Sequence, residues 1–375
     1  MVERVNRQFD REQIKTLPLS QRENKLTLQR DLIDPARYVP KLSAQAEAAV
    51  RAAAGEIRQA RSAGRPVILA FGAHCIKNGL APTLISLLEK GWVTHLATNG
   101  AGIIHDWEFA YQGMSGEDVR RYATEGQFGI WEQTGLYLNL AFLVGAYEGL
   151  GYGASVGTMV EQDGLRIRGE QELLASMRKG LAPAADSATL ERAAAAADLL
   201  AIIRKLHLPE GLLRIEHRYK AAGLQAAALR KGMPLTGHPM FGHDIIYTHP
   251  ANRGAAIGRV AERDFLSFVN SVAQLQGGVY LSVGSAVMSP MIFEKALSMA
   301  RNVAHQRGAK IDDFSIHVVD LAASTWDWQQ AGEPPMDNPA YYLRFCKTFS
   351  RMGGRMRYTS ADNRAFLVAL HQALA

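Results

Sequence analysis

A short segment, GHPMFGHDIIYTHP at residues 237–250, holds three histidines and one aspartate. Imidazole can bind a metal or move protons near neutral pH, and a carboxylate can hold a cation. The histidines, His238, His243 and His249, are five and six residues apart without an HExxH pattern, so their spacing alone does not make a zinc site. We interpret the segment as the rim of a pocket, with Asp244 as its strongest member and His243 or His238 in an acid–base or substrate-contact role.

Two further residues have the chemistry of a catalytic site. His105 follows a glycine-rich turn with Asp106 beside it, and an imidazole there can shuttle protons. Lys347 lies in YYLRFCKTFSRM, where apolar and aromatic neighbours would lower the pKa of an amine and let it form an imine. The alternatives are structural: a packed His105, an Asp244 that caps a turn, and a surface Lys347 whose stem packs on aromatic rings.

The elements that must position these residues alternate between short apolar runs and amphipathic segments. Apolar runs indicate strands at 66–72, 93–100, 233–238, 277–285, 314–321 and 355–360. Helical spacing indicates helices at 43–63, 80–91, 186–206, 210–231, 260–275, 290–308 and 361–374. Residues 101–183, rich in glycine and aromatics, are expected to form long loops around one helix near 136–149. The pattern predicts a Rossmann-like α/β fold with a mainly parallel sheet and helices on both faces.

Small and polar residues follow the predicted strands, at the edge where such sheets bind ligands. Glycine allows close backbone approach to a phosphate, although it also serves ordinary turns, and neither GxGxxG nor GxxxxGK[ST] is present. We therefore predict that NAD binds in a variant mode. The candidate cofactor contacts are Gly72, Ala73, His74, Thr98, Asn99, Gly100, Ala101, Gly102, Gly284, Ser285, Asp320 and Asp362.

Composition restricts the class of protein. The 375 residues are 47% hydrophobic and 21% charged, with a net charge of +6 spread along the chain, which does not favour nucleic-acid binding. The two cysteines exclude a disulfide framework, and neither a signal peptide nor a membrane-spanning run is visible. We expect a cytoplasmic enzyme, with residues 1–40 as an N-terminal extension on the surface or a neighbouring subunit and 41–375 as one α/β domain.

The chain resembles the deoxyhypusine synthase family from about Arg65 to its C-terminus. The family's strand ends and the turns after them resemble VILAFGAHCIKNG with LATNGAGIIHD, MPLTGHPMFGHDII and GGVYLSVGSAV in this sequence. One of the family's helices, which carries Asp-Leu-Arg, resembles RVAERDFLSFVNSV, and the segment with its catalytic lysine resembles FCKTF. The resemblance implies NAD, oxidation of a polyamine, transfer of its aminobutyl group through an imine on Lys347, and a tetramer with shared sites. Several family positions differ here, because His105 replaces an acid and LAASTWDW replaces an acidic segment.

These observations lead to one function hypothesis and two rivals. The first is an NAD-dependent transferase of the deoxyhypusine synthase type acting on a small amine, in a homo-oligomer, with Lys347, Asp244, His105 and His243 as catalytic residues. The second is a metal-assisted lyase or hydrolase on the same fold, with His74, His105, His238 and His243 at neighbouring strand ends as a possible ligand set. The third is a catalytically silent relative that binds a nucleotide.

Overall fold

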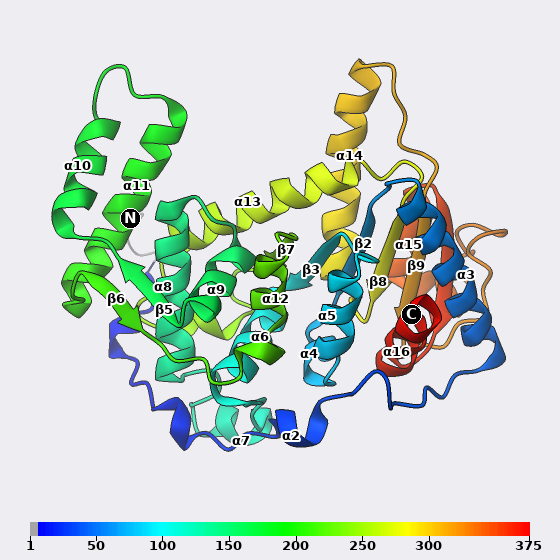
Figure 1. Cartoon of the computed structure of the whole chain (residues 1–375), viewed down its shortest axis with the longest axis horizontal. Coiled ribbons are helices and arrows are strands. Elements are labelled where there is room, and N and C mark those ends of the chain that lie inside the picture. The colour runs from blue at the N-terminus through cyan, green and yellow to red at the C-terminus, as the bar shows by residue number, and fades with distance from the viewer. Residues whose placement is uncertain (1–6) are drawn as a thin grey trace.

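A six-stranded parallel sheet forms the centre of the molecule (Figure 1). The computed structural model of the chain describes residues 7–375. The strands are β2 (Val67–Phe71), β3 (His95–Asn99), β7 (Leu235–His238), β8 (Val279–Val283), β9 (Ser315–Asp320) and β10 (Arg355–Ser360). They lie in the order β10-β9-β8-β2-β3-β7, so the chain runs outward from β2 through β3 to β7 and then fills the other side of β2. This is the order of a Rossmann fold built from two mononucleotide-binding halves, and it confirms the predicted fold class.

Helices cover both faces of the sheet, and the alternating side chains of β2 show why its sequence is continuously apolar. Val67, Leu69 and Phe71 join one buried cluster, while Ile68 and Ala70 join the other. The helices that contribute to the first cluster include α3 (Ala44–Ser62), α5 (Ala81–Glu89) and α16 (Asn363–Leu374). The second contains α13 (Gly254–Val272), α14 (Met288–Gln306) and α15 (Arg344–Arg351). The predicted strands and the helices at 43–63, 80–91, 186–206, 260–275, 290–308 and 361–374 are confirmed, with shifts of a few residues at their ends.

The stretch between β3 and β7 is mostly helical, so the prediction of long loops over 101–183 is wrong. It contains α6 (Gly100–Gln112), β4 (Met114–Ser115), α7 (Val119–Thr124), α8 (Glu132–Glu148), α9 (Tyr152–Glu161), β5 (Gly164–Ile167) and α10 (Glu170–Gly180). Glycines that suggested loops instead allow helices to pack closely: a Cβ on Gly145 would lie 1.9 Å from Oγ of Ser155, and one on Gly153 would lie 2.0 Å from the carbonyl oxygen of Leu235. Figure 1 shows this helical part beside the sheet.

The predicted helix at 210–231 is also wrong. After α11 (Ser187–Leu206), the chain forms strand β6 (Gly211–Arg214), the short helix η3 (Lys220–Ala222) and α12 (Leu224–Arg230). His207 ends α11 in the left-handed conformation, and β6 pairs antiparallel with the distant β5. A strand whose partner lies far away in sequence leaves no local periodicity to distinguish it from a helix.

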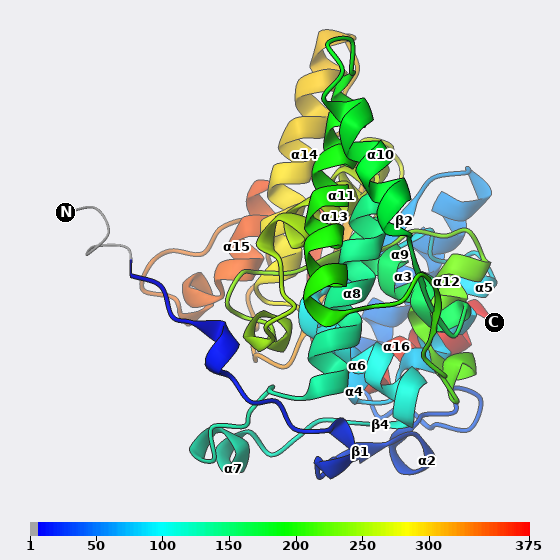
Figure 2. The same cartoon turned by 90° about the vertical axis from the view of Figure 1, so that its left-hand side faces the viewer.

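The N-terminal segment lies along its own chain. Residues 7–40 contain η1 (Arg11–Gln13), η2 (Leu19–Gln21), β1 (Leu26–Thr27) and α2 (Leu28–Asp31), and β1 pairs antiparallel with β4. The Arg11 guanidinium donates to the carbonyl oxygen of Tyr247 at 3.1 Å and to Oδ1 of Asn252 at 2.9 Å. In Figure 1 the blue ribbon of this segment runs along the bottom of the view, past α7 to α2, and Figure 2 shows the same segment after a quarter turn. Within residues 7–375, every helix is too short or too polar to cross a membrane.

Candidate active site

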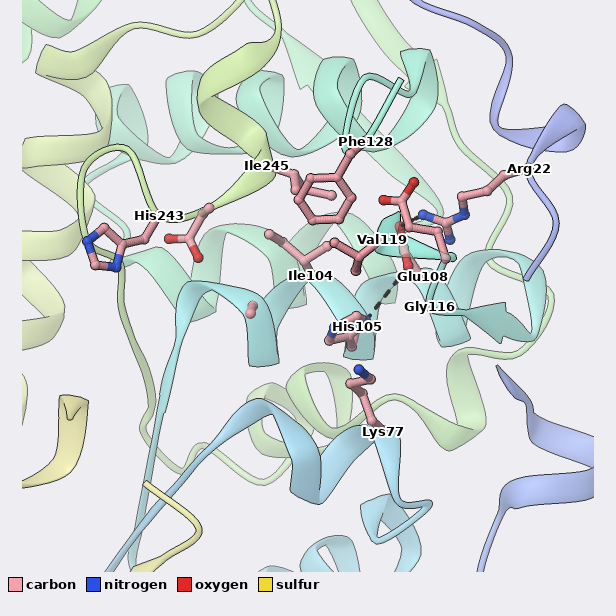
Figure 3. A pocket seen from close by; sticks show the side chains of 13 residues that line it. Arg22, Lys77, Ile104, His105, Glu108, Gly116, Val119, Phe128, His243 and Ile245 are labelled. Atoms are coloured by element: carbon pink, nitrogen blue, oxygen red, sulfur yellow. Dashed lines mark hydrogen bonds and ion pairs between the residues drawn. The ribbon is translucent and has the colours of Figure 1, made fainter. Parts of the chain in front are cut away.

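A cavity of about 200 Å³ lies beyond the carboxyl ends of β3 and β7 (Figure 3). Its wall is formed by the first turns of α6, the end of the short helix α4 (Ala73–Lys77) and the loop after β7. The segment around β4 and the N-terminal segment complete it. The cavity is lined by Arg22, Lys77, Ala101, Ile104, His105, Glu108, Gly116, Glu117, Val119, Phe128, His243, Asp244 and Ile245. Three of the four predicted catalytic residues, His105, His243 and Asp244, therefore meet there.

One oxygen of the Asp244 carboxyl group lacks a hydrogen-bond partner within residues 7–375. It lies just before η4 (Ile245–Thr248) and sits against the start of α6, where a Cβ on Gly100 would be 2.2 Å from its Oδ2 atom. Oδ2 is buried and makes no hydrogen bond within the described residues 7–375. Burial raises the pKa of Asp244 to about 6. At neutral pH the group is mostly ionised, and an uncompensated carboxylate in such a place favours a cation beside it.

His105 is a neutral imidazole at the same cavity. Burial lowers its pKa to about 4, with the positive charge of Lys77 acting in the same direction and Glu108 opposing it. Its Nδ1 atom lies 2.7 Å from Oγ of Ser115 on β4. Figure 3 shows the His105 ring between Lys77 and Glu108 at the base of the cavity. A neutral histidine held through one ring nitrogen can accept a proton at the other.

Arg22 and Glu108 form a buried ion pair in the cavity wall. Nη1 of Arg22 donates to Oε1 of Glu108 at 2.7 Å, and both side chains are 1% exposed. Burial alone would raise the pKa of Glu108, but the Arg22 charge and its hydrogen bond outweigh burial, and the net shift is downward. Glu108 therefore stays an ionised acceptor at neutral pH.

The remaining lining is mixed in character. Apolar side chains of Ile104, Val119, Phe128 and Ile245 face the cavity together with the Lys77 ammonium, for which no ion pair is found within residues 7–375. Burial raises the pKa of Glu117, whose Oε2 accepts from Nε1 of Trp131 at 2.8 Å. The cavity thus offers an apolar body with charged groups at its edges, as small polar ligands require.

The four histidines of the candidate metal set do not all come together: His105 and His243 both line the cavity, but His238 does not. His238 is buried, with Nε2 2.9 Å from Oγ1 of Thr236 and its ring edge-on to Phe268 of α13. His249 lies elsewhere, with Nε2 3.4 Å from Glu132. Within residues 7–375 no three histidine, cysteine or carboxylate side chains are grouped as metal ligands would be. The set of His74, His105, His238 and His243 is therefore wrong as a metal site, because β7 directs His238 away from the cavity.

Lys347 lies in a different part of the molecule. It belongs to α15, which packs against α14 and β10, and its Nζ atom sits 3.3 Å from the centre of the Tyr341 ring. In the sheet, β10 and β7 are the two opposite edge strands. Within one chain Lys347 is therefore not brought to Asp244 and His105, and its catalytic role remains a prediction.

The predicted cofactor turns meet at the switch point between β2 and β8. A Cβ on Gly72 would lie 2.0 Å from the carbonyl oxygen of Gly284, which itself has φ +57°. Ala73 and His74 begin α4 directly after Gly72, and the Oγ of Ser285 accepts from the backbone N–H of Ser289. Only glycine permits this approach of two strand ends, and this crevice is where a Rossmann fold binds a dinucleotide.

Other predicted cofactor residues are engaged inside the chain. The Thr98 hydroxyl donates to the carbonyl oxygen of Phe71, and Asn99 caps α6 by accepting from the N–H of Gly102. Asp362 caps α16, and Asp320 accepts from the N–H of Ala322. Ala101 lines the cavity described above, and Gly100 packs against the Asp244 carboxyl group. The direct contacts of these residues with a dinucleotide remain predictions.

Sequence reasoning missed Lys77, Arg22, Glu108 and Ser115. Glu108 lies three residues after His105 on a helix, which places the two on one face, but that spacing is visible only once α6 is recognised. Arg22 and Ser115 come from the N-terminal segment and β4, whose pairing leaves no local pattern.

Comparison with family models and with curated protein sequences finds no match. Among solved structures, the chain is similar to unliganded AgrE, with 16% identity, 90% of this chain and 34% of AgrE covered, and a TM-score of 0.44. It is also similar to ArgZ, an arginine dihydrolase from cyanobacteria, with 14% identity, 88% and 32% covered, and a TM-score of 0.40. A conserved LOR/SDH protein from Methanococcus maripaludis S2 has 10% identity, 96% and 76% covered, and a TM-score of 0.40.

AgrE has also been crystallised with ornithine and NAD+. The chain spans about a third of the length of AgrE and ArgZ. The resemblance to deoxyhypusine synthase is wrong, because these neighbours are other proteins and no family model matches. With it, the aminobutyl transfer, the polyamine substrate and the tetramer lose their support. Because these structural similarities are low, the function proposed below rests on the geometry of this chain.

Proposed function

We propose that this protein is an NAD(H)-dependent enzyme that oxidises a small amine. One observation carries the proposal: Asp244, whose buried Oδ2 has no hydrogen-bond partner within residues 7–375, lines a cavity that is also lined by the neutral imidazole of His105. The carboxylate would bind the ammonium group of the substrate, and the imidazole would accept its proton.

The switch point between β2 and β8 supports the choice of cofactor. The two glycines Gly72 and Gly284 leave room for backbone approach there, and α4 runs from Gly72 to Lys77, which lines the cavity. A helix of five residues is about 7.5 Å long, so the crevice and the cavity are neighbours. Gly72, Ala73, His74, Gly284 and Ser285 would hold the dinucleotide.

Asp244, His105 and a bound cofactor would together account for every proton and electron of the proposed amine oxidation. The bound cofactor supplies a two-electron acceptor. The substrate ammonium, held by Asp244, loses one proton from nitrogen to His105, and the adjacent carbon loses its hydrogen with the bonding electron pair, so that a C=N bond forms. The products are an iminium, the reduced cofactor and one proton. The apolar side chains of Ile104, Phe128 and Ile245 would keep water from the reacting carbon.

Binding and turnover test the proposal separately. Calorimetry should detect NAD or NADH binding, and a panel of small primary amines should produce reduced cofactor, followed by its absorbance. His105→Gln should lower the rate by roughly 10²- to 10⁴-fold, the contribution of a general base, while the dissociation constant of NAD stays within about twofold. Folded protein that binds neither NAD nor NADH at millimolar concentration would refute the cofactor, and NAD binding without any amine oxidation would favour a silent nucleotide-binding protein.

A further inference from the structure

Three side chains form a continuous hydrogen-bonded chain behind the cavity. Nδ1 of His105 lies 2.7 Å from the Ser115 hydroxyl, which lies 2.5 Å from Oε2 of Glu108. Ser115 is fully buried on β4, while His105 and Glu108 are one turn apart on α6. The serine hydroxyl therefore lies between an imidazole and a carboxylate, and within residues 7–375 it hydrogen-bonds to no other side chain.

The direction of each hydrogen bond follows from the ion pair at the far end. Glu108 is paired with Arg22, so its ionised carboxylate can only accept hydrogen bonds. The single proton of the Ser115 hydroxyl must then point to Glu108. Its oxygen is left to accept from His105, which requires a proton on Nδ1. In a neutral imidazole, a proton on Nδ1 leaves Nε2 as an unprotonated acceptor.

We propose that Ser115 and Glu108 are positioning residues that fix the Nδ1–H tautomer of His105 and thereby present Nε2 to the cavity as the proton acceptor. The assignment of the acceptor to amine oxidation rests on the function proposed above, whereas the tautomer itself does not. When Nε2 takes up a proton, the positive imidazolium is stabilised through Ser115 by the Glu108 carboxylate, as an orienting carboxylate stabilises histidine in a catalytic triad.

The charged groups that face His105 come from three elements. Glu108 acts from α6, Arg22 from the N-terminal segment, and Lys77 and His74 from α4. Arg22 and Lys77 oppose protonation of the ring, and the Glu108 carboxylate favours it. Without the serine bridge, the nearest carboxylate oxygen is 3.9 Å from Nδ1, which is too far for a hydrogen bond. Ser115 is thus the contact through which Glu108 controls the ring.

Histidine-selective ¹⁵N labelling and long-range ¹H–¹⁵N correlation spectra of the full-length protein test the tautomer without any ligand. The His105 signals are assigned by their loss in His105→Gln. At pH 7 we expect a protonated Nδ1 and an unprotonated Nε2. A native spectrum in which Nε2 carries the proton would overturn the proposal, and this measurement needs no variant of Ser115 to fold.

Two variants separate positioning from general support of the fold. Ser115→Ala should shift His105 to a tautomer mixture and lower kcat by roughly ten- to a hundredfold, as loss of orienting partners commonly does, with NAD affinity unchanged. Thr134→Val is the matched control, because Thr134 also donates to Glu108, at 3.1 Å, but does not touch His105; it should keep the Nδ1–H tautomer. If Ser115→Ala keeps the native tautomer, Ser115 has no positioning role.

The proposed function can fail independently. A native Nδ1–H tautomer in a protein that oxidises no amine would support the positioning role of Ser115 and Glu108 and refute NAD-dependent amine oxidation. Amine oxidation with His105 in the opposite tautomer would keep the function and refute that positioning role.

Discussion

Asp244 and His105 have shifted pKa values for the same reason. Burial penalises the charged form of each side chain, so it raises the pKa of the Asp244 carboxyl to about 6 and lowers the pKa of the His105 imidazole to about 4. Between about pH 4 and pH 6 both side chains are mostly neutral, and above about pH 6 an ionised carboxylate lies beside a neutral imidazole. That combination binds a cation and takes its proton, and acid–base pairs of this kind are set by environment rather than by residue type.

Asp244→Asn should therefore weaken amine binding and stabilise the fold. In the native protein, KM for the amine should fall as pH rises from 5 to 7, because the carboxylate ionises; the variant should have a high KM without that dependence. The folded-state pKa is raised above its usual value of 3.8, so the carboxyl contributes stability at low pH that is lost as pH rises through about 6.

Denaturant unfolding tests the predicted gain in stability of Asp244→Asn. The free energy of unfolding of Asp244→Asn at pH 7 should exceed that of the native protein by up to about 3 kcal/mol, because the pKa rises from 3.8 to about 6 and each pKa unit corresponds to about 1.36 kcal/mol. The difference should shrink at pH 4. An equal or lower stability at pH 7 would mean that Asp244 has a partner in solution.

Lys347→Arg should leave amine oxidation within about twofold of the native rate. The Lys347 ammonium rests on the Tyr341 ring beside β10, and the cavity lies beyond β7 at the other edge of the sheet. Steady-state rates and borohydride trapping during turnover measure this. An abolished rate, or substrate trapped on Lys347, would restore the predicted imine mechanism and require a site completed by another copy of the chain.

At the scale of elements, the close approach of the ends of β2 and β8 requires glycine at position 72. Gly72→Ala would place a Cβ 2.0 Å from the carbonyl oxygen of Gly284, which is backbone and cannot move aside without separating the strands. We expect loss of NAD binding by calorimetry and a fall in stability of more than about 2 kcal/mol. Gly258→Ala is the control: it lies exposed within α13 with open space around it, and it should stabilise by up to about 1 kcal/mol.

A second prediction at the scale of elements concerns the ion pair of Arg22 and Glu108, which joins the N-terminal segment to α6. Arg22→Met leaves Glu108 buried without its cation and should cost about 3–5 kcal/mol of unfolding free energy. Glu108→Gln combined with Arg22→Met removes both charges and should recover part of that loss, as measured by denaturant unfolding. Additive losses in the double variant would show that the two side chains are not coupled.

The sequence predicts the elements whose patterns are local. VILAF and VYLSV are recognisable as buried strands, and the helix predicted at 43–63 corresponds to α3, which Ser43 caps at its start. Asp244 and His105 were found because both follow strands that end at the same sheet edge. Ser115, Arg22 and β6 were missed because their roles depend on pairing with distant segments, and glycines between helices look like loop glycines when only the sequence is considered.

At the scale of the whole molecule, two regions share the proposed reaction. The proposed NAD site lies at the switch point between β2 and β8, while the cavity proposed to hold the amine is lined mainly by α6, the segment around β4, the loop after β7 and the N-terminal segment (Figures 1 and 3). The short helix α4 begins at the crevice and ends at the cavity. Each ligand should therefore stabilise the fold by itself, through contacts that the other does not share.

Thermal and denaturant unfolding with each ligand tests this arrangement. NAD at 100 times its dissociation constant should raise the free energy of unfolding by about 2.7 kcal/mol in both the native protein and Asp244→Asn, because the carboxylate is not part of the crevice. A saturating amine should add a further increment in the native protein, since its ammonium relieves the uncompensated charge of Asp244. In Asp244→Asn that increment should vanish while the NAD increment remains. If the amine stabilises both proteins equally, it binds outside the cavity and Asp244 is not its anchor.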